Sequence, residues 1–383
     1  MIAIANGNII GGLPANLSGG GGANPDFVST WDTTKAGSAS NTVVLPLLSG
    51  GTYSGKIDWG DGNSDSLSYA NRTHVYASSG IYTITLSGTM VGFRFINTGD
   101  KAKILDISNW GELAPTPNRG FQGCTNLDVS ATDAPIITGN NLDYMFYNCS
   151  SLTTADFSKW DTSSITTAQG TFQNCYYFNG QLDNWVHSGV TSLHTFFFNA
   201  DRFAGNLDSW DTSGVTSWYE TFRGANWFNA SMAGWVIRGN MQGSFLCNSN
   251  NTLQGIGMDT WDVSQMTRFS AYACSSLNPD VTNWDTSSLL IAQGCWQSCS
   301  SFNRSMANWD VNQVTNFTNF LLGSRLSTAN YDATLIAWDA QGTMAFSGTV
   351  NFGSSKYTSG GAAEAARTSL ISKWGGITDG GAA

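Results

Sequence analysis

Aromatic and small apolar residues recur at a fixed spacing through the middle of the chain. Twelve residues after several tryptophans stands another aromatic residue, fifteen after stands Cys or Ala, and eighteen after stands Phe. Because these columns keep one phase, they predict a tandem repeat of about 25 residues. The tryptophans, spaced by 25, 25, 25, 26, 23 and 25 residues, are Trp160, Trp185, Trp210, Trp235, Trp261, Trp284 and Trp309.

A unit of this length is too small to bury its apolar side alone, so neighbouring units are expected to stack around one shared core. The Trp, Phe and Cys/Ala columns should then form ladders inside that core. Runs such as Leu182-Asp183 and Val215-Thr216 are expected to supply strands. The Asp that follows most of the tryptophans is expected to cap a turn. A shorter distance from Trp to Cys247 and to Cys274 predicts a bulge or loop in those coils.

Outside the repeats the pattern changes. Residues 81–86 alternate between two sets of side chains, which predicts a half-buried strand. Two glycine clusters within residues 1–25 predict a flexible arm and linker. The Ala-rich stretch 362–372 predicts the chain's one helix. The chain as a whole is therefore predicted to be mainly β.

Two resemblances extend this prediction. Residues 144–152, 178–185 and 210–216 resemble BspA-type leucine-rich repeats, a family of bacterial surface proteins that is also found in phage genomes. The likeness covers roughly residues 100–325 and implies surface adhesion and partner binding in place of catalysis. Residues 57–62, with His74-Val-Tyr76, resemble the PKD-type domain, which implies an immunoglobulin-like β-sandwich.

These resemblances imply four consecutive parts. The expected fold is an immunoglobulin-like β-sandwich followed by a capped, leucine-rich-repeat-like solenoid. The tail resembles the cap that often closes such arrays. The parts are an N-terminal arm and linker at 1–25, the sandwich at 26–97, the solenoid at 98–325 and a cap with a short helix at 326–383.

Charge excludes some classes of partner. A net charge of −10 disfavours nucleic acid, which requires a basic surface. No run of eighteen apolar residues is present to span a membrane. The first residues lack the basic region and long apolar core of a signal peptide. We therefore expect a virion surface location, with the extracellular space or a bacterial cell surface as the alternative.

Residues with reactive side chains have structural interpretations. Cys124, Cys149, Cys175, Cys274 and Cys299 share a column with Ala200 and Ala225, so we expect buried thiols and neither disulfides nor zinc. The Asp of the repeats recurs once per unit, as a turn residue would, and Asp58 and Asp61 are assigned to a turn in preference to a calcium site. His74 is expected to form a structural hydrogen bond, and His187 and His194 lack a nearby nucleophile motif. We predict no catalytic residue, cofactor or metal.

One variable position per repeat is the candidate for binding. It holds Ser151, Tyr177, Arg202, Trp227, Ser276 and Ser301 in successive units. Equivalent positions on stacked coils lie about 5 Å apart, so Tyr177, Arg202 and Trp227 should form an exposed stripe suited to binding. The alternative is that they face a loop or another subunit. Trp218 and Tyr219 are further candidates, being additional to the repeat consensus.

The expected function follows from these assignments. We expect a non-enzymatic virion structural protein, either a head decoration or a tail fibre component, which mediates adhesion to host surface glycans or proteins. The arm would contact other virion proteins by strand pairing through Ile2, Ile4, Ile9 and Ile10. The alternatives are an exported bacterial adhesin and a solenoid enzyme that degrades glycans, and assembly into a homo-oligomer stays open.

Overall fold

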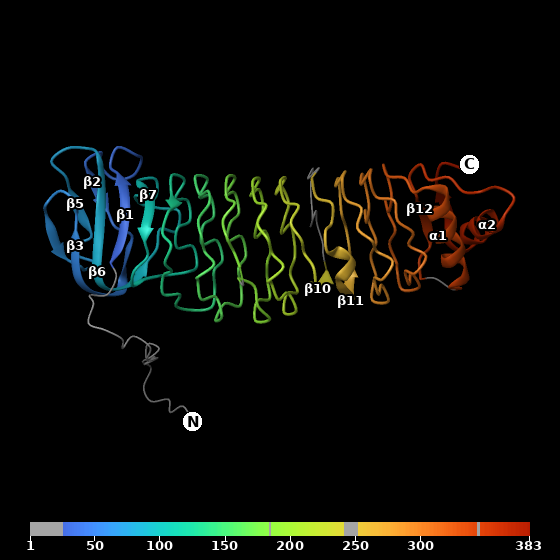
Figure 1. The fold of residues 1–383 in the computed structure, drawn as a ribbon, viewed down its shortest axis with the longest axis horizontal. Coiled ribbons are helices and arrows are strands. Elements are labelled where there is room, and N and C mark those ends of the chain that lie inside the picture. The colour runs from blue at the N-terminus through green and yellow to red at the C-terminus, as the bar shows by residue number, and fades with distance from the viewer. Residues whose placement is uncertain (1–25, 184, 241–251, 343–344) are drawn as a thin grey trace, which may run out of the picture.

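The protein is elongated, with a β-sheet at one end, a stack of coils along its length and two helices at the other end (Figure 1). The structure, a computed structural model, describes residues 26–183, 185–240, 252–342 and 345–383. The predicted arm at 1–25 lies outside these residues. Strands outnumber helices in the described chain, which confirms the prediction of a mainly β protein.

A sheet of long antiparallel strands forms the N-terminal end. Its central strand, β1 (Phe27–Asp32), pairs on one side with β6 (Ile81–Phe93) and on the other with β7 (Ile104–Asn109). Strand β6 also pairs with β3 (Leu47–Asp58). In β6, Ile84 and Leu86 are buried while Thr85 is only partly covered, so the predicted alternation is present. A separate pair joins β2 to β5. The strands are β1 (Phe27–Asp32), β2 (Thr42–Val44), β3 (Leu47–Asp58), β4 (Ser64–Ser66), β5 (Thr73–Val75), β6 (Ile81–Phe93) and β7 (Ile104–Asn109).

This sheet continues into the first coils. β8 (Leu113–Pro115) pairs in parallel with β6, and β9 (Asp128–Val129) pairs in parallel with β7. At the same junction the buried Lys103 donates from Nζ to the carbonyl oxygens of Ala39 and Thr42, each at 2.8 Å. The N-terminal sheet and the first coils are therefore joined by hydrogen bonds.

Stacked indoles run through the coils, as the spacing predicted. Trp210 and Trp235 lie 6.2 Å apart between ring centroids with their planes 5° from parallel, and Trp235 stacks on Trp261 in the same way, at 6.2 Å and 6°. Beside them a second ladder of phenylalanines includes Phe178 and Phe203, whose centroids are 5.8 Å apart. Large aromatic side chains gain much from burial, so these ladders hold successive coils together.

The runs Leu182-Asp183 and Val215-Thr216, predicted as strands, form none, and isolated β-bridges lie beside them at Gln181 and Ser217. Thr167 bridges in parallel to Asn141 and to Ser192. In several of the described coils two residues have positive φ angles, for example Thr195 at 51° and Asn199 at 56°. Because each left-handed residue turns the chain, the extended segments between them are too short for continuous ladders.

The array is irregular around the expected bulge. β10 (Val236–Asn240) and β11 (Asp262–Arg268) pair in parallel with two register shifts, and a short helix, η1 (Met258–Thr260), precedes β11. The irregularity predicted near Cys247 lies outside the described residues.

Two helices close the C-terminal end. The predicted helix is α2 (Ala362–Trp374), which packs against α1 (Thr328–Ala340). The prediction of a single helix was wrong, because Ser327 caps α1 through the Asn330 amide and Tyr331, Leu335 and Trp338 form its buried face. Beside the helices, β12 (Gly348–Asn351) pairs in parallel with β13 (Gly375–Thr378). None of the described helices combines the length and apolarity needed to cross a bilayer.

Candidate functional site

Tyr177, Arg202 and Trp227 lie side by side on three successive coils. The guanidinium carbon of Arg202 is 4.5 Å from the ring centroid of Trp227 and 5.8 Å from that of Tyr177. Tyr177 is 56% exposed and Trp227 is 53% exposed. The stripe predicted from the repeat is therefore present as a surface feature, with its arginine between two rings in cation–π contact.

The coil backbone sets the outward direction of the stripe. Arg202 N–H donates to the carbonyl oxygen of Tyr176 at 3.1 Å, and Trp227 N–H donates to that of Asp201 at 3.0 Å. The next residue in each coil points inward and joins the phenylalanine ladder, as Phe203 does. The stripe side chains therefore project from backbone that is hydrogen-bonded to the preceding coil.

A groove of about 390 Å³ lies beside the stripe. Tyr176, 44% exposed, forms part of its wall and was missed by the sequence reasoning. The sequence could have indicated that Tyr176 is exposed, because the equivalent position in other repeats holds small or polar residues such as Ser150. The remaining lining residues are Tyr177, Asn199, Asp201, Arg202, Gly224 and Asn226.

The groove opens where a ladder of asparagines ends. Asn174 Nδ2 donates to Asn148 Oδ1 at 2.8 Å, and Asn199 Nδ2 donates to Asn174 Oδ1 at 3.0 Å. The next coil has Gly224 in this column, with the same left-handed turn (φ 75°) but no side chain. A Cβ atom placed there would come within 2.5 Å of Asn199 Oδ1. The missing side chain therefore creates the hollow.

Residues 140–254 and 239–356 match a family described as "Mycoplasma protein of unknown function, DUF285". The two matches together span more than half of the chain. The chain belongs to the DUF285 family. The matched segments cover most of the stacked coils, which supports the resemblance to BspA-like repeats. Searches among curated proteins and among solved structures found no significant match.

One of the candidate residues on the DUF285 repeats was misplaced. Trp218 is fully buried and stacks on Trp235 at 5.6 Å, so it does not belong to an exposed binding surface. The equivalent position in the two preceding repeats holds Ala168 and Leu193, both buried, and this apolar column was the signal against exposure. Tyr219 is 39% exposed and lies against His194, away from the groove. The candidate assembly residues Ile2, Ile4, Ile9 and Ile10 lie outside the described residues.

The cysteines of the DUF285 repeats are buried, with one departure from the predicted chemistry. Cys149 Sγ donates to the carbonyl oxygen of Phe121 at 3.1 Å and Cys175 Sγ to that of Phe146 at 3.0 Å, and both thiols are free. Burial raises the pKa of the Cys149 and Cys175 thiols, which keeps them protonated. Cys274, however, is disulfide-bonded, so the prediction that the whole column is reduced was wrong.

The aspartates that follow the tryptophans cap turns, as predicted. Asp211 Oδ1 accepts from Ser213 N–H at 3.0 Å, and Asp161 and Asp285 make the same contact with Ser163 and Ser287. Hydrogen bonds from Ser213 lower the pKa of Asp211, against a smaller effect of burial. Their carboxylates are thus engaged in local turns.

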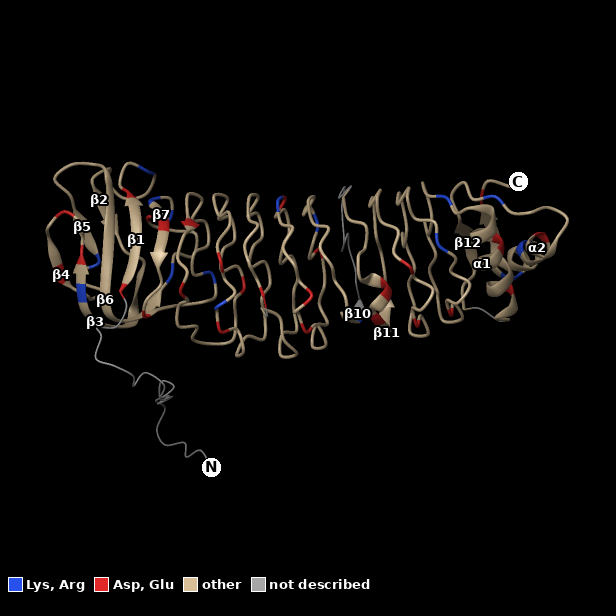
Figure 2. Cartoon of the chain, in the orientation of Figure 1, with Lys and Arg blue, Asp and Glu red and all other residues tan. Residues whose placement is uncertain are grey.

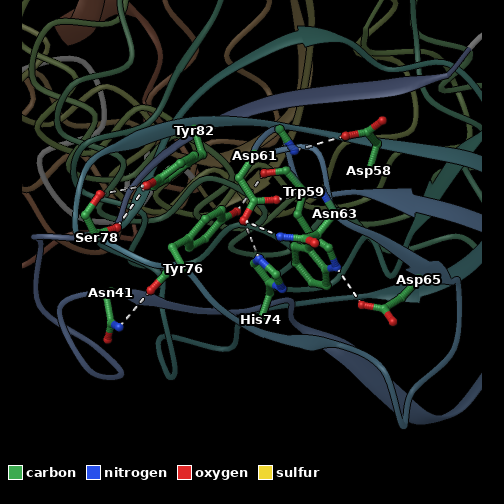
Figure 3. Close-up of polar contacts among 11 residues, drawn as sticks. Asn41, Asp58, Trp59, Asp61, Asn63, Asp65, His74, Tyr76, Ser78 and Tyr82 are labelled. Atoms are coloured by element: carbon green, nitrogen blue, oxygen red, sulfur yellow. Dashed lines mark hydrogen bonds and ion pairs between the residues drawn. The ribbon is translucent and has the colours of Figure 1, made fainter.

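A second polar cluster lies in the N-terminal sheet (Figure 3). His74 Nε2 is 2.9 Å from Asp61 Oδ2 and its ring stacks on Trp59 at 4.8 Å, which confirms its structural hydrogen bond. Asp61 Oδ1 also accepts from Asn63 N–H at 3.0 Å, and Tyr76 Oη donates to the Trp59 carbonyl oxygen at 2.9 Å. Burial would raise the pKa of Asp61, but hydrogen bonds from His74 and Asn63 lower it to about 2.

These contacts assign both aspartates of the motif to turns. Asp58 Oδ1 accepts from Gly60 N–H at 3.0 Å, in the turn that Asp61 continues. Within the described residues no group of three or more His, Cys, Asp or Glu side chains is arranged to hold a metal ion. Figure 2 shows acidic and basic residues scattered over the described coils, without an extended basic stripe.

Proposed function

We propose that this protein is a non-enzymatic surface protein that adheres to a host surface through the stripe of Tyr177, Arg202 and Trp227. The observation that carries the proposal is the exposure of two large aromatic residues at a position that is Ser in other repeats. The fold does not require large side chains there. Exposed aromatic residues flanking an arginine are typical anchors of binding surfaces.

The finer description of the fold belongs to the same proposal. We assign the array to a leucine-rich-repeat-like solenoid, supported by parallel bridges between successive coils and by the shared indole and phenylalanine ladders. We assign residues 26–97 to a PKD-like sandwich, supported by the turn of Asp58 and Asp61 and by its contact with His74. Both ends of the array are covered, which leaves its long faces for partners.

The proposed location is the surface of a virion, where the N-terminal arm would contact other virion proteins. A bacterial cell surface is the alternative placement. The disulfide at Cys274 supports either one, because disulfides persist in oxidising surroundings. Immunogold labelling of purified particles and of intact host cells distinguishes the two, since label confined to cells would reject the virion placement.

Replacing Tyr177, Arg202 and Trp227 together by Ser tests the proposal. We expect a nearly unchanged melting temperature and a large loss of attachment to host cells. Tyr272→Ser is the matched control, because Tyr272 is an exposed tyrosine of the repeats that does not line the groove. Normal melting together with normal attachment of the triple variant would reject the stripe as the adhesive surface.

A further inference from the structure

The groove beside the stripe contains hydrogen-bond acceptors that the described protein leaves unused. Asn199 Oδ1 has no donor among these residues, because the asparagine ladder ends at Gly224. Asn226 Nδ2 donates to Asp201 Oδ1 at 2.7 Å, which leaves Asp201 Oδ2 without a donor from the described chain. Asn226 Oδ1 is buried and has no hydrogen-bond partner among the described residues. A ligand that fills the groove must therefore bring donors.

The same ligand must also bring acceptors. Arg202 lies between two rings, and its guanidinium makes no hydrogen bond or ion pair with the described residues. Its N–H groups are donors only. A carboxylate or phosphate could accept from Arg202 but could not donate to Asn199 or Asp201. Hydroxyl groups do both, so the groove matches a ligand with many hydroxyls.

The flanking rings suit the apolar faces of sugars. Tyr177 and Trp227 present exposed aromatic surface on either side of Arg202, two coil steps apart. Coils stacked at strand spacing place these side chains about 10 Å apart. An extended disaccharide has a similar length, so a linear oligosaccharide along the array axis would reach both rings.

Other occupants fit the groove less well. A peptide strand would need unpaired backbone, but the amides of Arg202 and Trp227 already pair with neighbouring coils. A protein interface would need an apolar centre, whereas the same column continues on other coils as Ser151, Ser276 and Ser301. The charges of Asp201 and Arg202 cancel, and a net charge of −10 repels acidic polymers.

We infer that this groove binds a neutral linear glycan, whose hydroxyls pair with Asn199, Asp201 and Arg202 while its rings lie against Tyr177 and Trp227. The inference rests on the proposed function and specifies the ligand of that site. In this arrangement Asn199 and Asp201 accept from the sugar, and Arg202 donates to it.

Calorimetric titration of the full chain with oligosaccharides tests the inference. The neutral probes are cello- and manno-oligosaccharides from monosaccharide to hexasaccharide, and the acidic probes are oligogalacturonides of matched length. We expect affinity for a neutral series to rise up to about the disaccharide or trisaccharide and then level off, as both rings become covered. Trp227→Ser should weaken this binding about tenfold or more, and Tyr272→Ser should leave it unchanged.

Two results would overturn the inference. One is tighter, stripe-dependent binding of the acidic series, and the other is no binding of any oligosaccharide in the panel. If the triple Ser variant still fails to attach to host cells in either case, the proposed function stands and only the ligand class is wrong. Normal attachment of that variant would instead reject the proposed function itself.

Discussion

The indole Nε1 of Trp210 donates a hydrogen bond of 2.9 Å to the carbonyl oxygen of Leu182, in the preceding coil. Trp185 makes the equivalent bond to Phe157 at 2.7 Å, and Trp309 bonds to Val281 at 3.1 Å. These three indoles therefore pack in the aromatic core and also satisfy a carbonyl group of the coil before them. This double role explains why the column contains Trp where Phe would also fill the core.

Two substitutions at Trp210 separate these contributions. Trp210→Phe keeps an aromatic ring but leaves the Leu182 carbonyl oxygen without its donor, so we expect the free energy of unfolding to fall by about 1–3 kcal/mol. Trp210→Ala also creates a cavity and should cost about 3–5 kcal/mol. Urea denaturation of both variants measures the difference. A Trp210→Phe variant as stable as the wild type would show that the hydrogen bond contributes nothing.

The free cysteines are expected to be inert in the folded protein. Burial raises the pKa of the Cys149 and Cys175 thiols, and both Sγ atoms already donate to backbone carbonyl oxygens. Thiol reagents should label them only after denaturation, as mass spectrometry can show. Cys175→Ala should cost little, since Ala200 fills the same position one coil later. Rapid labelling of Cys175 in the native state would contradict the buried ladder.

Acid should weaken the N-terminal sheet through Asp61. Its pKa is lowered from 3.8 to about 2 in the folded state, so its carboxylate stabilises the fold at pH values above the unfolded pKa. That contribution is lost as pH falls from about 4 towards 2. Asp61→Asn should therefore show a smaller loss of stability than the wild type between these pH values. Unfolding monitored at both pH values checks this, and identical losses would exclude Asp61 as a source.

Regular features of the array could be predicted from the sequence because each is repeated. The spacing of Trp210 and Trp235 predicted stacked indoles, and the recurrence of Asp211 predicted a capped turn. Tyr177, Arg202 and Trp227 were found as a stripe by the same logic, since they depart from Ser in one column. Comparing all repeats at one position shows which side chains the fold itself requires.

Features that occur once were missed or misassigned. The prediction that Trp218 is exposed rested on its large side chain alone. The buried Ala168 and Leu193 at the equivalent position show that this column faces inward. Helix α1 has no repeated pattern to reveal it. The groove depends on the absence of a side chain at Gly224, and a missing group leaves no signal unless the asparagine ladder beside it is known.

Gly224→Asn should close the groove without disturbing the fold. Asn148, Asn174 and Asn199 occupy this column with φ angles of 62°, 61° and 56°, so the left-handed turn accepts Asn. The new side chain would continue the ladder by donating to Asn199 Oδ1, once that flexible amide shifts to relieve the contact at 2.5 Å. We expect a melting temperature within a few degrees of the wild type and about tenfold weaker attachment.

Gly323→Asn is the matched control for this substitution. Gly323 lies in the same column of a later coil, with φ 76°, and does not line the groove. It therefore reproduces the backbone effect of replacing a left-handed glycine by Asn but leaves the ligand surface intact. Attachment to host cells should be lost only in the Gly224 variant. If both variants melt normally and attach equally well, the stripe binds its partner without the groove, because filling the hollow would then have displaced nothing.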